Sequence, residues 1–183
     1  KSFITSAYEY DVPVYISTIK DSSLALNLAV HRLENKKFDL DFVREIIEQA
    51  AIVYDSKKSG ILELGGGVPK NTAQQTGPLL DQILRRNDGG QEYIIQITDA
   101  RPDTGGLSGA TLQEGKSWGK IKDSHEGIVT VYADATIAFP ILALYVLSNQ
   151  KSREPKRLYK KIGDMYNKLS EDYFKNPNNS KNK

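Results

Sequence analysis

One lysine of this chain stands in an unusual chemical setting. The run Glu114-Gly115-Lys116-Ser117-Trp118-Gly119-Lys120 contains the only tryptophan, and Lys120 follows that tryptophan by two residues. A lysine that acts as an amine nucleophile must lose its proton, which burial against a large apolar neighbour favours. If the run is helical, Lys116 lies one turn before Lys120 and also disfavours its charged form. We therefore take Lys120 as the candidate for covalent chemistry, against the ordinary alternative of a solvated charge.

The composition argues against several other kinds of site. The 183 residues include 25 Lys and Arg against 23 Asp and Glu, so no broad cationic field exists and neither nucleic acid nor a membrane is expected as a partner. Cysteine is absent, and His31 and His125 lie far apart without acidic residues at ligand spacing, so we expect no metal. No membrane-length apolar run and no signal peptide occur, which predicts a soluble, cytoplasmic protein.

Predicted strands alternate with predicted helices along the chain. This alternation indicates an α/β protein with a Rossmann-like layered fold, in which helices flank a mostly parallel sheet. Residues 136–147 are apolar on all sides, which predicts a buried helix too short to span a membrane. The patterns predict strands at 12–16, 61–64, 93–98 and 128–132, and helices at 22–35, 39–56, 69–86 (kinked or divided at Gly77-Pro78), 111–117 and 136–147, with a loop at 99–110.

Small or acidic residues follow each predicted strand. Asp21 follows the first, Gly65-Gly66-Gly67 the second, Asp99-Ala100 the third and Asp134-Ala135 the fourth. Ligands of open α/β folds bind at this edge of the sheet. Glycines let backbone amides approach an anion, and an aspartate accepts hydrogen bonds from ribose hydroxyls. The pattern favours a dinucleotide site, although glycine triplets also form ordinary turns and the spacing is not Gly-x-Gly-x-x-Gly.

Four segments resemble, in order, the C-terminal half of the deoxyhypusine synthase family. They are LGGGVPKN at 64–71, GGLSG at 105–109, SWGKI at 117–121 and VYADA at 131–135, and the similarity extends over residues 1–148. The resemblance implies an enzyme that oxidises a polyamine with NAD and carries the aminobutyl unit as an imine on a lysine. The imine that then forms with an acceptor amine is reduced.

The resemblance also implies roles for individual residues. Lys120 takes the position of the imine-forming lysine. For Glu114 and Lys116, a solvated helix face is the alternative. The implied NAD contacts are Asp21, Gly66, Thr98, Asp134 and Ala135, together with the strand-end residue Asp99. The implied polyamine pocket consists of Asn71, Gly105, Ser108, Glu114 and Trp118.

Three positions depart from the eukaryotic pattern of the family. Asn71 stands in place of a histidine, and Leu26 and Leu107 stand in place of carboxylates, so a polyamine loses two anionic partners. The segments resemble instead the bacterial deoxyhypusine-synthase-like branch of the homospermidine-synthase type. That branch implies spermidine or putrescine as the donor and a small amine as the acceptor. The alternatives are a protein lysine as acceptor, a non-catalytic regulatory subunit, or an NAD-binding module with other chemistry such as deacylation.

The chain divides by composition near residue 150. Residues 1–150 are predicted to form the NAD-binding and catalytic domain, and 151–183 a helical extension with a disordered tail. The resemblance implies a tetramer with shared active sites, or a complex with an N-terminal half. Because the chain begins with Lys1, we expect that a longer chain was trimmed or split before it. An apolar stripe predicted to pack on a neighbouring subunit consists of Tyr159, Ile162, Tyr166, Leu169 and Tyr173.

Overall fold

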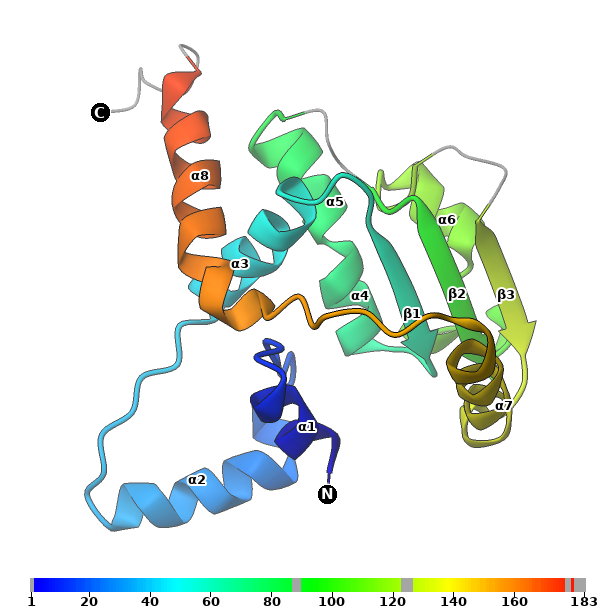
Figure 1. Ribbon diagram of the computed structural model, residues 1–183, viewed down its shortest axis with the longest axis horizontal. Helices are drawn as coiled ribbons and strands as arrows, with labels where there is room; N and C mark the ends of the chain where they lie inside the picture. Colours follow the sequence, from blue (N-terminus) through cyan, green and yellow to red (C-terminus); the bar gives the residue numbers. More distant parts are fainter. Residues whose placement is uncertain (1, 87–89, 123–126, 177–178, 180–183) are drawn as a thin grey trace.

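Three parallel strands form one sheet. The computed structural model describes residues 2–86, 90–122, 127–176 and 179. The strands are β1 (Gly60–Leu64), β2 (Tyr93–Thr98) and β3 (Ile128–Tyr132), and they lie in that order. Helices connect and flank them (Figure 1), which confirms the α/β class and the parallel sheet. All three strands lie at their predicted positions.

The helices begin where the sequence offers side-chain caps. Ser22, Asp41, Thr111 and Asp134 each accept a backbone N–H at the start of a helix. The predicted division of helix 69–86 is confirmed, because this segment passes through α4, α5 and a π-helical turn η2. The elements outside the sheet are α1 (Phe3–Glu9), η1 (Ile19–Asp21), α2 (Ser23–Leu33), α3 (Phe42–Tyr54), α4 (Val68–Gln74), α5 (Thr76–Pro78), η2 (Leu79–Ile83), η3 (Pro102–Thr104), η4 (Leu107–Gly109), α6 (Leu112–Ser117), α7 (Ala135–Asn149), η5 (Leu158–Lys161) and α8 (Ile162–Lys175).

The two faces of the sheet differ in polarity. Glu63 of β1, Gln96 of β2 and Thr130 of β3 lie in register on one face, which α4 and α6 cover. Side chains alternate between the faces of a strand, so the neighbouring residues point to the other face. There α7 contacts β2, as Figure 1 also shows. Within the register this second face carries Leu62, Leu64, Ile95, Ile97, Val129 and Val131, with Gly60 and Tyr93 at its amino end.

Helix α7 is exposed, so the prediction of a buried helix at 136–147 is wrong. None of its residues is buried, and the exposed fractions of Ile141, Leu144 and Leu147 are 68%, 68% and 80%. A helix that is apolar all round needs cover on every side, but here only one side meets the sheet. Leu62 and Leu64 of β1 and Val129 and Val131 of β3 are exposed beside it. We call α7 and these four residues the apolar layer.

The N-terminal segment also differs from the prediction. Residues 12–16 belong to no helix or strand, so the predicted first strand is wrong. β-branched residues favour a strand, but a strand forms only where the segment pairs with another one, and residues 12–16 pair with none of the described strands. Tyr15 instead donates a hydrogen bond from its hydroxyl to Glu48 of α3 at 3.4 Å. Burial, followed by the charge of Glu48, raises the pKa of Tyr15. Helix α1, which was not predicted, begins at the cap Ser2.

The largest apolar cluster joins α3 to α8. Leu169 of the stripe predicted between Tyr159 and Tyr173 is buried in this cluster against α3 of the same chain, and the packing of the stripe on a neighbouring subunit stays a prediction. Arg44 of α3 also lies over the ring of Tyr166, 5.3 Å from its centre. The predicted disordered tail falls partly on 177–178 and 180–183, which, like His125, lie outside the described residues. The buried members of the cluster are Ala50, Ala51, Leu80, Met165 and Leu169.

No helix within the described ranges is long and apolar enough to cross a membrane.

Replacing Leu169 by Ala is expected to lower the free energy of unfolding by about 2–5 kcal/mol, because it leaves a cavity between α8 and α3. Leu33→Ala on α2 is the matched control, since Leu33 is 84% exposed, and is expected to change stability by less than about 0.5 kcal/mol. Urea unfolding followed by circular dichroism measures both. Equal losses in the two variants would contradict this placement of α8.

Candidate active site

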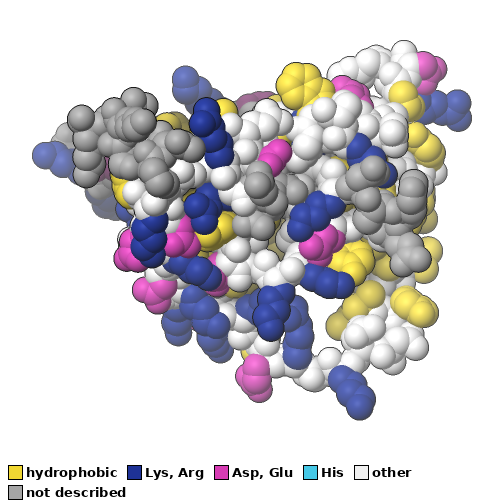
Figure 2. All heavy atoms as spheres, turned by 90° about the horizontal axis from the view of Figure 1, so that it is seen from above, with side chains coloured by type: hydrophobic (Ala, Val, Ile, Leu, Met, Phe, Trp, Pro, Cys, Tyr) yellow, Lys and Arg dark blue, Asp and Glu magenta, His cyan; other side chains and the backbone are white. Residues whose placement is uncertain are grey.

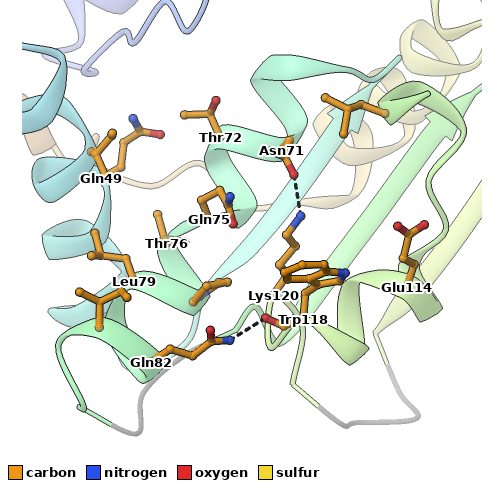
Figure 3. Close-up of a pocket in the computed structure, with 14 residues that line it drawn as sticks. Gln49, Asn71, Thr72, Gln75, Thr76, Leu79, Gln82, Glu114, Trp118 and Lys120 are labelled. Atoms are coloured by element: carbon orange, nitrogen blue, oxygen red, sulfur yellow. Dashed lines mark hydrogen bonds between the residues drawn. The ribbon is translucent and has the colours of Figure 1, made fainter.

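A cleft of about 740 Å³ lies between α3, the helical segment from α4 to η2, and the turn that ends α6. Its volume is in the range of small-molecule sites. Four residues selected from the sequence meet there, namely Asn71, Glu114, Trp118 and Lys120 (Figure 3). The other lining residues are Ile46, Gln49, Thr72, Gln75, Thr76, Pro78, Leu79, Gln82, Ile83 and Leu107.

A tight turn at the end of α6 sets the direction of Lys120. Gly119 has φ of 70°, a left-handed conformation that glycine adopts without strain. The N–H of Gly119 donates to the carbonyl of Lys116, and the N–H of Lys120 donates to the carbonyl of Gly115, both at 3.0 Å. This is the hydrogen-bond pattern of a Schellman helix end. Lys120 is therefore not helical, and the prediction that Lys116 shares a helix face with it is wrong.

A second backbone contact holds Lys120 from the other side. The N–H of Gln91 donates to the carbonyl of Lys120, and the N–H of Lys122 donates to the carbonyl of Gln91, both at 3.0 Å. Gln91 lies just before β2, so the main chain of Lys120 lies near the amino end of that strand. Ile121, which pairs with Gln91, is buried against Ile94. The lysine side chain therefore starts from a rigid base.

The amine of Lys120 reaches across the cleft to α4. Its Nζ donates a hydrogen bond to Oδ1 of Asn71 at 2.6 Å (Figure 3). Asn71 lies near the start of α4, directly after the glycine loop that follows β1. The Lys120 side chain is half-buried, so its amine remains accessible from the cleft.

Trp118 lines the cleft without enclosing Lys120. Its side chain is 60% exposed and that of Lys120 is half-buried, so the burial of Lys120 against Trp118 stays a prediction. The carbonyl of Trp118 accepts a hydrogen bond from Gln82 at 3.1 Å, which ties the turn to η2. An exposed indole face attracts cations. Among the described residues that line the cleft, Glu114 of α6 is the one with a carboxylate side chain, and it is exposed.

The carboxyl ends of the three strands share one edge, as predicted. The N–H of Gly65 donates to the carbonyl of Ile97 at 2.7 Å, which joins the ends of β1 and β2. A Cβ on Gly66 would lie 3.0 Å from Cα of Ser108, so the two glycine-containing loops touch. Figure 2 shows the opposite end of the sheet, where Lys and Arg side chains are spread with fewer acidic ones among them.

Two of the residues predicted to contact NAD at this edge, Thr98 and Asp134, make hydrogen bonds within the chain. The hydroxyl of Thr98 is buried, donates to the carbonyl of Ser108 at 3.5 Å and accepts from the N–H of Ala100 at 3.2 Å. Asp134 caps α7, and its Oδ1 accepts from both the hydroxyl and the N–H of Thr136 at 2.7 Å. These bonds from Thr136 hold the pKa of the Asp134 carboxyl below its usual value.

The remaining selected residues lie apart from the cleft lining. Asp99 and Gly105 are exposed in the loop after β2, and Ala135 begins α7. Asp21 is exposed in η1, and because the predicted first strand does not form, no strand places it at the sheet edge. Among the residues that the structure describes, no three His, Cys, Asp or Glu side chains lie together as a metal site would need.

Sequence reasoning missed the amide-rich wall of the cleft. Gln49 of α3, Gln75 and Gln82 line it together with Thr72 and Thr76. The sequence does indicate this wall, because Asn71 and Gln75 carry amide side chains one helical turn apart, shortly after the glycine loop.

It also missed two buried polar residues next to this wall. Lys70 of α4 is 8% exposed and donates from Nζ to the carbonyl of Ala110 at 2.9 Å, and Glu63 of β1 is 4% exposed.

Comparison with known proteins gives a consistent family. The model of the family described as deoxyhypusine synthase matches residues 1–146. A "Deoxyhypusine synthase-like protein" of Nostoc sp. is 44% identical over 176 residues, which cover 93% of this chain and 46% of that protein. A "Probable deoxyhypusine synthase 2" of Methanosarcina acetivorans is 40% identical over 157 residues, covering 86% and 44%. The chain spans about half the length of the curated relatives it matches. These matches confirm the resemblance inferred from the four segments.

Replacing Gly77 by Ala is expected to disturb Lys120 from a distance. A Cβ on Gly77 would lie 2.6 Å from the carbonyl oxygen of Gly119 and 2.8 Å from the nitrogen of Gly90, so backbone must move. We expect a loss of stability of about 1–3 kcal/mol, measured by thermal unfolding. Gly163→Ala on α8 is the matched control, because open space surrounds that position. It is expected to be neutral or stabilising by up to about 1 kcal/mol. A Gly77→Ala variant as stable as Gly163→Ala would contradict the close approach.

Proposed function

Because the chain belongs to the deoxyhypusine synthase family, we propose that it carries the reactive lysine of an NAD-dependent aminobutyl transferase. The donor is a polyamine, spermidine or putrescine, and the acceptor is a small amine, which gives a homospermidine-type product. One observation carries the proposal: the Lys120 amine is held by Asn71 inside a cleft that also contains the carboxylate of Glu114 and the indole of Trp118.

The cleft residues have complementary tasks in such a reaction. The neutral amine of Lys120 attacks the imine carbon of the oxidised donor. The bond from that carbon to the donor nitrogen breaks, and propane-1,3-diamine leaves from spermidine, or ammonia from putrescine. The four-carbon unit then remains as an imine on Lys120 until the acceptor amine displaces the lysine. Asn71 orients the lysine nitrogen, Glu114 binds a substrate ammonium group and Trp118 offers its indole face to the cationic chain.

The edge formed by the strand ends has the character of a cofactor site. Gly65, Gly105 and Gly106 have positive φ, and nothing lies within 4 Å of the place where a Cβ would be. Their backbone is therefore open to close approach by a ligand. NAD bound there would accept a hydride from the donor amine and return it at the end of the reaction. The residues proposed to hold it are Asp21, Gly66, Thr98, Asp99, Asp134 and Ala135. On the substrate side, Gly105 and Ser108 follow β2 at the same edge.

Two neutral residues of the cleft lining support a small acceptor. Asn71 and Leu107, which stand where eukaryotic members are expected to carry a histidine and a carboxylate, both line the cleft. Leu26 is exposed on α2, outside the cleft lining. Glu114, which carries the carboxylate among the described residues of the cleft lining, can bind one end of a diamine such as putrescine. One end of the diamine reacts at Lys120 while the ammonium at its other end pairs with Glu114.

Borohydride trapping tests the proposed chemistry. We expect that the assembled protein, incubated with NAD and spermidine or putrescine and then reduced, carries an aminobutyl adduct on Lys120 in peptide mass analysis. Lys120→Ala should abolish the adduct, whereas Lys122→Arg, at a surface ion pair with Glu92, should retain it. Products with putrescine, spermidine and a candidate protein acceptor are compared in the same assay. An absence of any Lys120 adduct contradicts the proposal, wild-type activity of Lys120→Ala indicates a regulatory subunit, and nicotinamide release indicates deacylation.

We further propose that additional polypeptide covers the apolar layer and extends the sheet into a Rossmann-like fold. The N-terminal half of the family architecture, within a tetramer, is the proposed occupant. The support is physical: β1 and β3 are both edge strands of the described sheet, and apolar side chains are exposed beside them. The length of the relatives is compatible with this proposal.

The double variant Ile141→Lys/Leu144→Lys tests the apolar layer. Because both positions are exposed on α7, the variant is expected to fold but to lose association with a co-expressed N-terminal half. Light scattering after size-exclusion chromatography measures the mass of the complex. Leu33→Lys on α2 is the control, because it makes the same change from an apolar to a charged side chain outside the apolar layer. A wild-type chain that stays monomeric beside the N-terminal half would contradict the proposal.

A further inference from the structure

A second, smaller cavity adjoins the cleft between α3 and the N-terminal segment. Its volume is about 150 Å³, and three residues, Ile46, Gln49 and Thr72, line both this cavity and the cleft. In Figure 3, Gln49 and Thr72 lie toward one end of the cleft and Glu114 toward the other, with Lys120 between them. We call the smaller cavity the side pocket. Its remaining lining residues are Tyr15, Ile16, Ser17, Phe42 and Glu45.

The side pocket contains a carboxylate that no cation compensates. Glu45 of α3 is half-buried, and none of the described residues forms an ion pair or a hydrogen bond with its carboxylate. The cation next to it in the chain, Arg44, pairs instead with Glu48 at 2.9 Å. Burial, followed by the charges of Glu48 and Asp41, raises the pKa of Glu45. A cation that enters the side pocket removes this cost, because it stabilises the charged carboxylate.

The walls of the side pocket suit the end of an aliphatic amine. Tyr15 and Phe42 contribute aromatic side chains to the lining. The hydroxyl of Tyr15 donates to Glu48 at 3.4 Å, which holds the N-terminal segment against α3. The amide nitrogen of Gln49 donates to the carbonyl of Glu45 at 3.3 Å, so the amide oxygen is left as an acceptor where the side pocket meets the cleft. Aromatic rings, amide oxygens and carboxylates are the groups that bind ammonium ions.

We propose that the side pocket binds one terminal ammonium group of a polyamine, with Glu45 as its counter-ion. This inference rests on the proposed function, because it concerns a substrate of the same cleft. Glu45 and Glu114 then hold ammonium groups toward the two ends of the cleft, with Lys120 between them. Spermidine carries an ammonium group at each end and can occupy both sites, whereas an analogue without one terminal amine occupies a single site. Glu45 thereby replaces in charge a carboxylate that the cleft lacks at Leu107.

Polyamine binding without NAD tests this role, because no hydride transfer occurs in its absence. Isothermal titration calorimetry on the assembled protein gives the dissociation constants of spermidine and of two analogues, N-propylputrescine and N-butylpropane-1,3-diamine, which each lack one terminal amine. The wild type is expected to bind both analogues about tenfold more weakly than spermidine. Glu45→Gln, which preserves the size of the side chain, should weaken spermidine binding about tenfold.

The analogues locate the contact. For the analogue that lacks the amine bound by Glu45, Glu45→Gln is expected to change the affinity less than about twofold, whereas the other analogue loses as much as spermidine. Glu45→Asp, which keeps the charge, should restore part of the affinity for spermidine. Glu171→Gln on α8 is the matched control, because Glu171 forms a surface ion pair with Lys175 and lines neither the cleft nor the side pocket.

The outcomes separate this inference from a purely structural role and from the proposed function. Equal affinity of Glu45→Gln and the wild type for spermidine overturns the inference, as does a wild type that binds spermidine no better than the analogues or not at all. A loss in Glu45→Gln that is equal for spermidine and both analogues also overturns it, because the effect is then not a contact with one amine. If binding depends on Glu45 as expected but no NAD-dependent adduct forms on Lys120, the inference holds and the aminobutyl transfer does not.

Discussion

The position of Lys120 depends on a backbone contact between two chain segments that meet beside β2. Gln91 donates to the carbonyl of Lys120 and accepts from the N–H of Lys122. The contact is possible only because the neighbouring positions lack side chains. A Cβ on Gly77 would meet the carbonyl of Gly119, and a Cβ on Gly90 would lie 2.9 Å from the nitrogen of Lys122. Close packing of glycines thus decides where the amine of the lysine can reach.

A second constraint is the polar interior under the helices. Thr130, Gln96 and the carbonyl of Ala110 form a chain of hydrogen bonds, and Lys70 donates to the same carbonyl. Buried polar groups are tolerated only when they are paired, so these contacts hold α4 and the strands in one arrangement. The covered face of the sheet therefore combines these paired polar residues with an apolar cluster that contains Ile94, Leu112 and Ile121.

Some predictions from the sequence were confirmed and others were wrong, because some features depend on neighbouring residues and others on contacts with distant segments. Strands β2 and β3 were predicted where they occur, since runs of β-branched residues bounded by Gly and Asp act locally. The serine cap at Ser22 and the division at Gly77-Pro78 are also local features. The segment 12–16 has the same composition as a strand, but strand formation needs a partner, which local sequence does not specify. The burial of α7 failed for the same reason, because cover comes from other segments.

For the site, the sequence by itself selected Lys120 as the reactive candidate, whereas the left-handed turn at Gly119 that ends the helix before it was not predicted. It also determined that glycine and acidic residues collect where the strands end. Only the tertiary structure decided that Asn71 faces Lys120, that Trp118 is exposed, and that Glu63 and Lys70 are buried. The hydrogen bond between Asn71 and Lys120 joins residues 49 positions apart along the chain. Contacts at such separation depend on how the elements pack and on which charges that packing buries, and no local pattern of residues encodes either.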